Sequence, residues 1–277
     1  CKCTKKIMNT PLFAPHLPLF QQINIETHAY EALRQQIDTQ KIKYIQYEEE
    51  LKAAPFYTFQ SVIETLNKIQ HPLSKSYGII CHLSNVNDSP TVRDVKDTFR
   101  NEMIELGKMV SQSSVLYNAM KQISTECPLE KRVLELSIKS MERGGVNLPK
   151  AEKARLMELD MKSSELKNRY NECVLDSTKA FKHIVQDNSV MKGVPLWARE
   201  IWNPDQPDKG PWTITLSGPS VMAALKHISC PNTRKIIYIA YISRAESNEE
   251  IIKNIMDIAL EKANILGFEN YTQMSLD

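Results

Sequence analysis

The sequence predicts a mostly α-helical protein with a small β element around residues 183–217. Composition is the first reason. Glycine is scarce, with 8 residues among 277, whereas Lys, Glu, Gln, Met and Leu, which lose little side-chain freedom in a helix, are plentiful. The second reason is spacing, because apolar residues recur every three or four positions and so share one helix face. The length allows one large or two modest domains, and we expect a helical N-terminal domain over 9–150 followed by a second part over 151–277.

The first half of the chain predicts an apolar arm and then a series of helices. Residues 9–22 carry three prolines among Leu and Phe, which favours an extended arm docked on the main body. A long helix follows over 25–51, with these apolar residues close to one face: Ala29, Leu33, Ile37 and Tyr44. Further helices are expected over 58–69, which His71-Pro72 would close, and then over 73–86, 91–109 and 114–123.

Proline and glycine mark the ends of the next two helices. Pro128 stands where a helix would begin, and Gly144-Gly145 would cap its C-terminus, since glycine takes a left-handed conformation without a Cβ clash. The longest regular stretch then runs from Asn147-Leu148-Pro149 to about Lys182. Its heptad spacing predicts packing on one side within the molecule rather than a dimeric coiled coil, through Leu159, Leu166 and Cys173.

The helical period is lost between His183 and Ser217. Four prolines and a glycine predict an irregular, exposed segment there: Pro195, Pro204, Pro207, Gly210 and Pro211. Within it, residues 212–216 favour a short strand that pairs with 183–186, and a further helix is expected to begin near Pro219.

Residues 236–267 contain one ambiguous element and one clear helix. The stretch IIYIAYI, 236–242, suits a buried strand as well as a helix. A final helix is expected to begin with a capping box of Ser247 and Glu250, to end at Gly267, and to be followed by a short turn. We expect its packed face to comprise Ile252, Ile255, Met256, Ala259, Ala263 and Leu266.

Charge and cysteine usage narrow the class of protein. The net charge is +2 with both signs interspersed, which argues against a nucleic-acid partner. The longest apolar run, 236–242, is too short to span a membrane, so no membrane partner is expected. The six cysteines are widely spaced after Cys1 and Cys3, which favours reduced thiols, several of them buried, in an intracellular protein. The cytoplasm is the expected compartment, with mitochondrion or plastid as alternatives.

The residues show no catalytic constellation. No two of the six histidines lie four positions apart, and although His71 could approach Cys81-His82, separate structural histidines are the better interpretation. Ser220 is interpreted as a loop or helix-cap serine, and acidic runs such as Glu48-Glu49-Glu50 as a solvated face. Three tryptophans could form an apolar binding surface or anchor loops on the helices: Trp197, Trp202 and Trp212. We therefore assign no catalytic or metal residue, and substrate-binding residues stay unknown.

Several longer segments of the sequence, taken together, resemble a known protein family. The chain contains, in order, PHLPLFQQINIETH (15–28), HLSNVNDSPTVR (82–93), GGVNLP (144–149), NECVLDSTKAF (171–181), GPWTITLSGPS (210–220), TRKIIYIAYISRAES (233–247) and EKANILGFENY (261–271). This ordered set resembles the zinc metallo-oligopeptidases of the thimet oligopeptidase and oligopeptidase A family, in its plant and protist form. The similarity runs over nearly the whole chain.

The resemblance implies that the chain is the helical N-terminal half of a metallo-oligopeptidase, forming one wall of a channel that admits short, unstructured peptides. It also favours a helix for 236–242. In the family, a downstream His-Glu-x-x-His helix and a further Glu hold the zinc that activates water for peptide hydrolysis. That motif is absent here, so we expect no zinc bound by this chain and no peptidase activity from it alone. The expected partners are short peptides and the missing catalytic half, into which 151–277 would lead.

An alternative is a non-catalytic helical protein, derived from such a peptidase, that binds peptides or a partner. It is motivated by the missing motif and by Asp257-Ile-Ala-Leu260, which stands where the family usually has a leucine–arginine pair. If the chain is instead half of a peptidase, we expect helix faces meant for the catalytic half to be exposed as apolar patches that favour aggregation.

Overall fold

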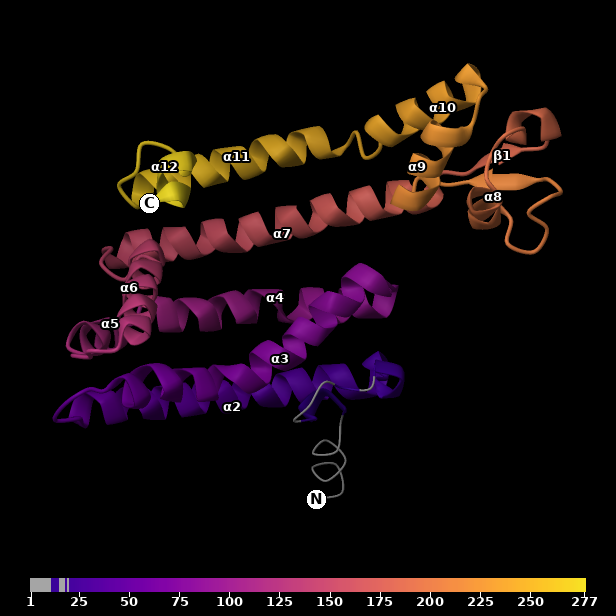
Figure 1. The fold of residues 1–277 in the computed structure, drawn as a ribbon. Helices are drawn as coiled ribbons and strands as arrows, with labels where there is room; N and C mark the ends of the chain where they lie inside the picture. The colour runs from indigo at the N-terminus through magenta and orange to yellow at the C-terminus, as the bar shows by residue number, and fades with distance from the viewer. Residues whose placement is uncertain (1–10, 15–17, 19) are drawn as a thin grey trace. The chain divides into compact units, whose positions relative to one another are not determined.

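The computed structural model describes residues 11–14, 18 and 20–277, and the chain is mostly helical (Figure 1). The predicted class, mostly α with a small β element, is confirmed. Cys1, Cys3, His16 and part of the arm over 9–22 lie outside the described residues. Packing divides the chain into two compact units. The first unit consists of the chain up to Met161 together with Lys262–Asp277, and the second unit consists of Lys162–Glu261. The division into domains at residue 150 stays a prediction.

The N-terminal arm is docked as expected but is not simply extended. It forms short 3-10 turns, η1 over Pro11–Phe13 and η2 over Phe20–Gln22. Leu12 is 1% exposed, and the Ser76 hydroxyl donates to its carbonyl oxygen at 3.0 Å. This hydrogen bond and the buried leucine fix the arm on the first unit.

Helix α2, Ile25–Ala53, confirms the predicted long helix. Asn24 caps it, since its side-chain oxygen accepts from the Thr27 amide at 3.0 Å. All four residues of the predicted face are buried: Ala29, Leu33, Ile37 and Tyr44. In Figure 1 this helix lies beside α3, and the two helices pack in one apolar cluster.

The predicted break at His71-Pro72 is wrong. A π-helical segment, η3 over Gln60–Glu64, continues directly into α3, Thr65–Val86, with Pro72 in its interior. Proline removes one backbone hydrogen bond. The buried stripe continues past it through Leu66, Leu73 and Ile80, so burial against α2 and α4 outweighs that loss.

The next three helices begin and end near the predicted residues. They are α4 over Pro90–Ser111, α5 over Ser114–Lys121 and α6 over Pro128–Arg143. Ser89 and Ser113 cap the first two through side-chain oxygens. At the end of α6, Gly145 has φ +90°, the Gly145 amide donates to the Glu142 carbonyl and the Val146 amide to the Met141 carbonyl. This is a Schellman cap, which confirms the predicted glycine stop.

Helix α7, Lys150–Ala180, is the longest helix among the described residues, and its two ends belong to different units. In the first unit it buries Leu156 and Leu159. Of the predicted heptad residues, Leu166 and Cys173 are only partly buried.

The second unit contains the predicted β element. Strand β1, His183–Val185, pairs antiparallel with β2, Trp212–Ile214, in the register His183↔Ile214. The segment between them is not irregular throughout: it contains a 3-10 turn, η4 over Asn188–Met191, and a helix, α8 over Leu196–Trp202. This segment folds because its apolar residues share a core with the sheet and α9, including Met191, Val194, Ala198, Trp202 and Trp212.

The remaining elements are α9 over Gly218–His227, α10 over Pro231–Ile242, α11 over Asn248–Ile265 and α12 over Tyr271–Leu276. IIYIAYI is therefore helical. Gly267, with φ +83°, follows the end of α11, where the Phe268 amide donates to the Ala263 carbonyl. The turn expected after Gly267 is instead the short helix α12, which Asn270 caps by accepting from the Gln273 amide at 2.9 Å.

The predicted packed face of helix α11 is correct only in part: Ala263 is fully buried, but other predicted residues are not. Ile251 and Ile258 are 4% and 6% exposed, whereas Ile252 and Met256, which we expected to pack, are 45% and 65% exposed. The four cysteines that the structure describes are free thiols, and none of them is fully buried, so the expectation of several buried thiols is wrong for these four. None of the helices in the described ranges combines the length and hydropathy that a membrane span requires.

Candidate functional site

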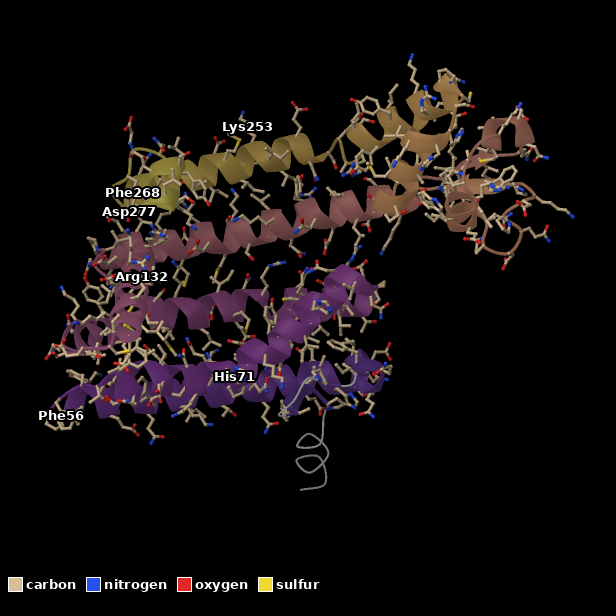
Figure 2. All side chains as sticks on the ribbon, in the orientation of Figure 1. Phe56, His71, Arg132, Lys253, Phe268 and Asp277 are labelled. Carbon is tan, nitrogen blue, oxygen red and sulfur yellow. The ribbon has the colours of Figure 1, made fainter. Side chains whose placement is uncertain are left out.

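The histidines do not converge on one point. His71, Cys81 and His82 all lie on α3, and ten residues of helix separate the first two by about 15 Å along the axis. Figure 2 labels His71. The His82 ring packs on Phe20, with the ring centroids 5.8 Å apart. His71 is therefore separate from Cys81 and His82, and the alternative of a shared site is wrong.

The other described residues offer no zinc-binding set either. The His28 Nδ1 atom accepts from the Asn24 amide at 3.1 Å, and the His227 ring meets Trp197 edge-on at 5.4 Å. Within the described ranges, no three side chains of the types His, Cys, Asp and Glu gather closely enough to hold a metal ion. The residues that the structure describes therefore do not form a set that fits the zinc implied by the resemblance.

Ser220 is a buried hydrogen-bond acceptor within a helix, and not the loop or helix-cap serine that we expected. It lies in the first turn of α9 and is fully buried. Its Oγ accepts from the Trp202 indole nitrogen at 2.9 Å and from the Thr215 amide at 3.0 Å. A nucleophilic serine needs a general base within hydrogen-bond reach, and neither of these two donors can act as one. The serine therefore ties α8 and the end of the β2 segment to α9.

The tryptophans act mainly as anchors. Trp202 and Trp212 are 4% and 1% exposed, and the Trp212 indole nitrogen donates to the Pro207 carbonyl at 3.0 Å. Only Trp197 is half-exposed. A surface made of all three tryptophans is therefore wrong, because two of them belong to the core of the second unit.

The acidic run at the end of α2 is largely solvated, as expected: Glu49 and Glu50 are exposed, and only Glu48 is partly buried. Glu48 accepts a hydrogen bond from the Ser113 hydroxyl of α5, and Glu49 pairs with Lys52 in the next turn. Burial, with the neighbouring Ser113 and Glu48 as lesser influences, raises the pKa of Tyr44 to about 12, so this phenol stays protonated. The cluster orders the junction of α2 and α5 and presents no acid–base pair to a substrate.

Two of the hollows on the described surface are mainly apolar and could accept a ligand or partner. The first, about 460 Å³, lies in the first unit among η3, α3, α4, α5 and α6. Gly107, beside which a Cβ would meet open space, contributes to its lining together with Val110 and Leu136.

The second hollow, about 360 Å³, lies in the second unit between α7 and α11. It is lined by Lys167, Tyr170, Asn171, Ile252, Ile255 and Met256. Beside this hollow, the Asn248 side-chain amide (Nδ2) donates to the Tyr170 carbonyl at 3.1 Å and so joins the two helices. Sequence reasoning missed this feature because it assigned Ile252 and Met256 to the packed side of α11.

Comparison with known proteins gives a consistent result. Residues 33–153 match the family model described as neurolysin/thimet oligopeptidase, N-terminal domain. The chain is 31% identical over 248 residues to "Probable cytosolic oligopeptidase A" of Arabidopsis thaliana, a match covering 82% of this chain and 35% of that protein. It is 30% identical over 247 residues to the same plant's "Organellar oligopeptidase A, chloroplastic/mitochondrial", covering 82% and 31%.

A bacterial relative matches more of the chain. Oligopeptidase A of Escherichia coli (strain K12) is 26% identical over 290 residues, covering 97% of this chain and 42% of that protein. The chain thus spans about a third to two fifths of the length of these curated relatives.

Proposed function

We propose that this chain, whose N-terminal part belongs to the neurolysin/thimet oligopeptidase N-terminal domain family, is the helical, non-catalytic part of a zinc metalloendopeptidase that hydrolyses short peptides. The observation that carries the proposal is the family match over 33–153, extended by similarity to oligopeptidase A over nearly the whole chain. The chain's own residues would contribute a wall of helices that limits access to short, unstructured peptides.

Zinc would be held outside this chain. The family resemblance supplies the chemistry, a zinc-activated water, while three of the described histidines are engaged in ring packing or capping: His28, His82 and His227. The proposal therefore assigns positioning and screening of peptides to this chain, and bond cleavage to a catalytic part of the oligopeptidase A type.

Peptide hydrolysis tests the proposal. The purified 277-residue chain should show no zinc-dependent cleavage of a fluorogenic oligopeptide, whereas the chain together with a catalytic part should cleave it. Zinc-dependent turnover by the chain alone would contradict the proposal. At the gene level, a reading frame that continues past Asp277 into a His-Glu-x-x-His segment would support it, and a stop codon directly after Asp277 would count against it.

The second candidate function is a non-catalytic protein that binds peptides or a partner. The apolar hollow between α3 and α6 favours it, because such a groove suits an apolar side chain of a peptide. This candidate predicts a stable cellular product of 31.7 kDa, whereas detection of a longer product alone by western blotting would exclude it.

For the compartment we propose the interior of the cell. The two plant relatives are named for the cytosol and for chloroplast and mitochondrion, so kinship alone leaves these alternatives open. Fractionation of cells that express the full-length natural protein would distinguish them.

A further inference from the structure

Exposed apolar side chains are concentrated in the second unit. More than half of the large apolar side chains that are exposed among the described residues lie within Lys162–Glu261, although this is the smaller unit. Helices α10 and α11 carry most of them. An ordinary surface helix shows apolar residues on one side and charged residues on the other, so a second apolar side needs an explanation.

Helix α10 is apolar on both sides. Its inner side contributes Ile237, which is fully buried, and Ala240 and Tyr241, which pack on the same core. Its outer side is also apolar but 38% to 60% exposed, and it comprises Ile236, Tyr238, Ile239 and Ile242. A helix that is apolar all round is typical of an element buried from both directions.

Helix α11 repeats this arrangement. Ile251 and Ile258 are buried, while a second apolar stripe at four-residue spacing is 45% to 65% exposed and comprises Ile252, Met256 and Leu260. Four residues make about one helical turn, so these three side chains follow one another along one side of the helix. Ile252 and Met256 also line the 360 Å³ hollow beside α7. The stripe therefore borders a concave, mainly apolar surface.

We propose that the outer sides of α10 and α11 are the docking face for the catalytic part of an oligopeptidase A-type peptidase, whether that part is joined to this chain or is a separate polypeptide. This inference rests on the proposed function and assigns the residues that make the contact. We call these seven residues the docking face: Ile236, Tyr238, Ile239, Ile242, Ile252, Met256 and Leu260.

The length of the relatives supports a catalytic part as the partner of the docking face. The bacterial match covers 97% of this chain, so it includes α10 and α11, and it leaves 58% of that relative outside the aligned segment, as its 42% coverage requires. A relative of this length has enough additional chain to cover apolar faces that are open here. Exposed patches of this kind on a chain without its partner are typical of interaction surfaces.

Binding measurements test the docking face. The probe is the part of the Arabidopsis cytosolic relative that follows its aligned segment, produced as a separate polypeptide and titrated with the 277-residue chain. Two double variants change the face, Ile239→Gln with Ile242→Gln on α10, and Ile252→Gln with Met256→Gln on α11. The matched control is Ile42→Gln with Ile45→Gln on α2, whose side chains are 67% and 56% exposed in the first unit.

We expect each docking-face variant to bind the probe about tenfold more weakly or worse, because buried apolar anchors dominate interface energies. The control should bind within about twofold of wild type. Since the altered side chains are exposed in the chain alone, its thermal unfolding should change little in all three variants. This readout separates lost docking from misfolding.

Three outcomes would overturn the inference. If wild type binds the probe and the docking-face variants bind equally well, the face is wrong while the proposed function stands. If wild type does not bind the probe, the proposed partnership and the docking face both fail. If sedimentation shows a dimer of the 277-residue chain that the docking-face variants dissociate and the control does not, a second copy occupies the face.

Discussion

Lys108 on α4 and Asp160 on α7 form an ion pair with Nζ and Oδ2 2.6 Å apart, and their side chains are only 11% and 21% exposed. Asp160 also accepts a hydrogen bond from Lys262, near the end of α11. The Lys108 Nζ lies 3.3 Å from the Gly144 carbonyl oxygen, at the cap of α6. One carboxylate thus joins segments of the first unit that are far apart in sequence.

Replacing Asp160 with Asn should destabilise the first unit. The substitution keeps the size of the side chain but leaves two lysines without their counter-charge, and removing one partner of a largely buried pair costs about 3 kcal/mol. The free energy of unfolding in urea at pH 7 measures this loss. The control is Glu135→Gln, which removes the exposed partner of Arg132 (labelled in Figure 2) and should cost less than about 0.5 kcal/mol. Equal losses for the two variants would contradict the prediction.

The Asp160 contribution should also depend on pH. Burial alone would raise the pKa of this carboxyl, but the hydrogen bonds and charges of Lys108 and Lys262 hold the pKa below its ordinary value of 3.8. A lowered pKa in the folded state means that the contribution is complete above pH 3.8 and is lost as the pH falls through the folded-state value. The difference in unfolding free energy between wild type and Asp160→Asn should therefore be constant from pH 7 to about 5 and shrink in stronger acid. A difference that grows on acidification would exclude this account.

Replacing Ser220 with Ala should weaken the core of the second unit. The change leaves the Trp202 indole N–H and the Thr215 amide without their acceptor, and a buried donor without a partner costs about 2 kcal/mol. Thermal unfolding followed by tryptophan fluorescence measures the loss, because Trp202 itself reports on the site. Ser229→Ala, at an exposed position, should leave the transition unchanged. If both variants unfold like wild type, Ser220 does not organise this core.

Local signals explain which parts of the fold could be predicted. Pro128, Gly145 and Gly267 restrict the backbone whatever surrounds them, and each one marks a helix end in the structure. Pro72 is the exception, because burial of Leu66, Leu73 and Ile80 keeps α3 continuous. Helix α8 was missed for the same reason: its seven residues carry little periodicity, and it forms because Ala198 and Trp202 are buried by the sheet and α9.

The apolar sides of α10 and α11 show what apolar periodicity alone cannot predict. Helix α11 carries two apolar sides, and spacing alone cannot say whether Ile251 and Ile258 or Ile252 and Met256 face the core. For α10, composition left strand and helix open, and the family resemblance favoured the helix that the structure has. Which apolar sides remain open is a property of the packed unit, so it could be found only in the structure.

Two glycine substitutions should have opposite effects on stability. Gly145 has φ +90°, and a Cβ there would lie 2.8 Å from Leu148 Cδ1 and 2.9 Å from Cδ2 of the fully buried Leu156. Gly145→Ala should therefore cost about 2 kcal/mol, from the left-handed backbone and from crowding. Gly78 instead lies inside α3 with open space around a Cβ, so Gly78→Ala should stabilise the chain by about 1 kcal/mol. Urea unfolding of both variants beside wild type measures the two changes. A shift of the same sign in both would show that the cap at Gly145 does not require glycine, or that Gly78 is more crowded than its surroundings indicate.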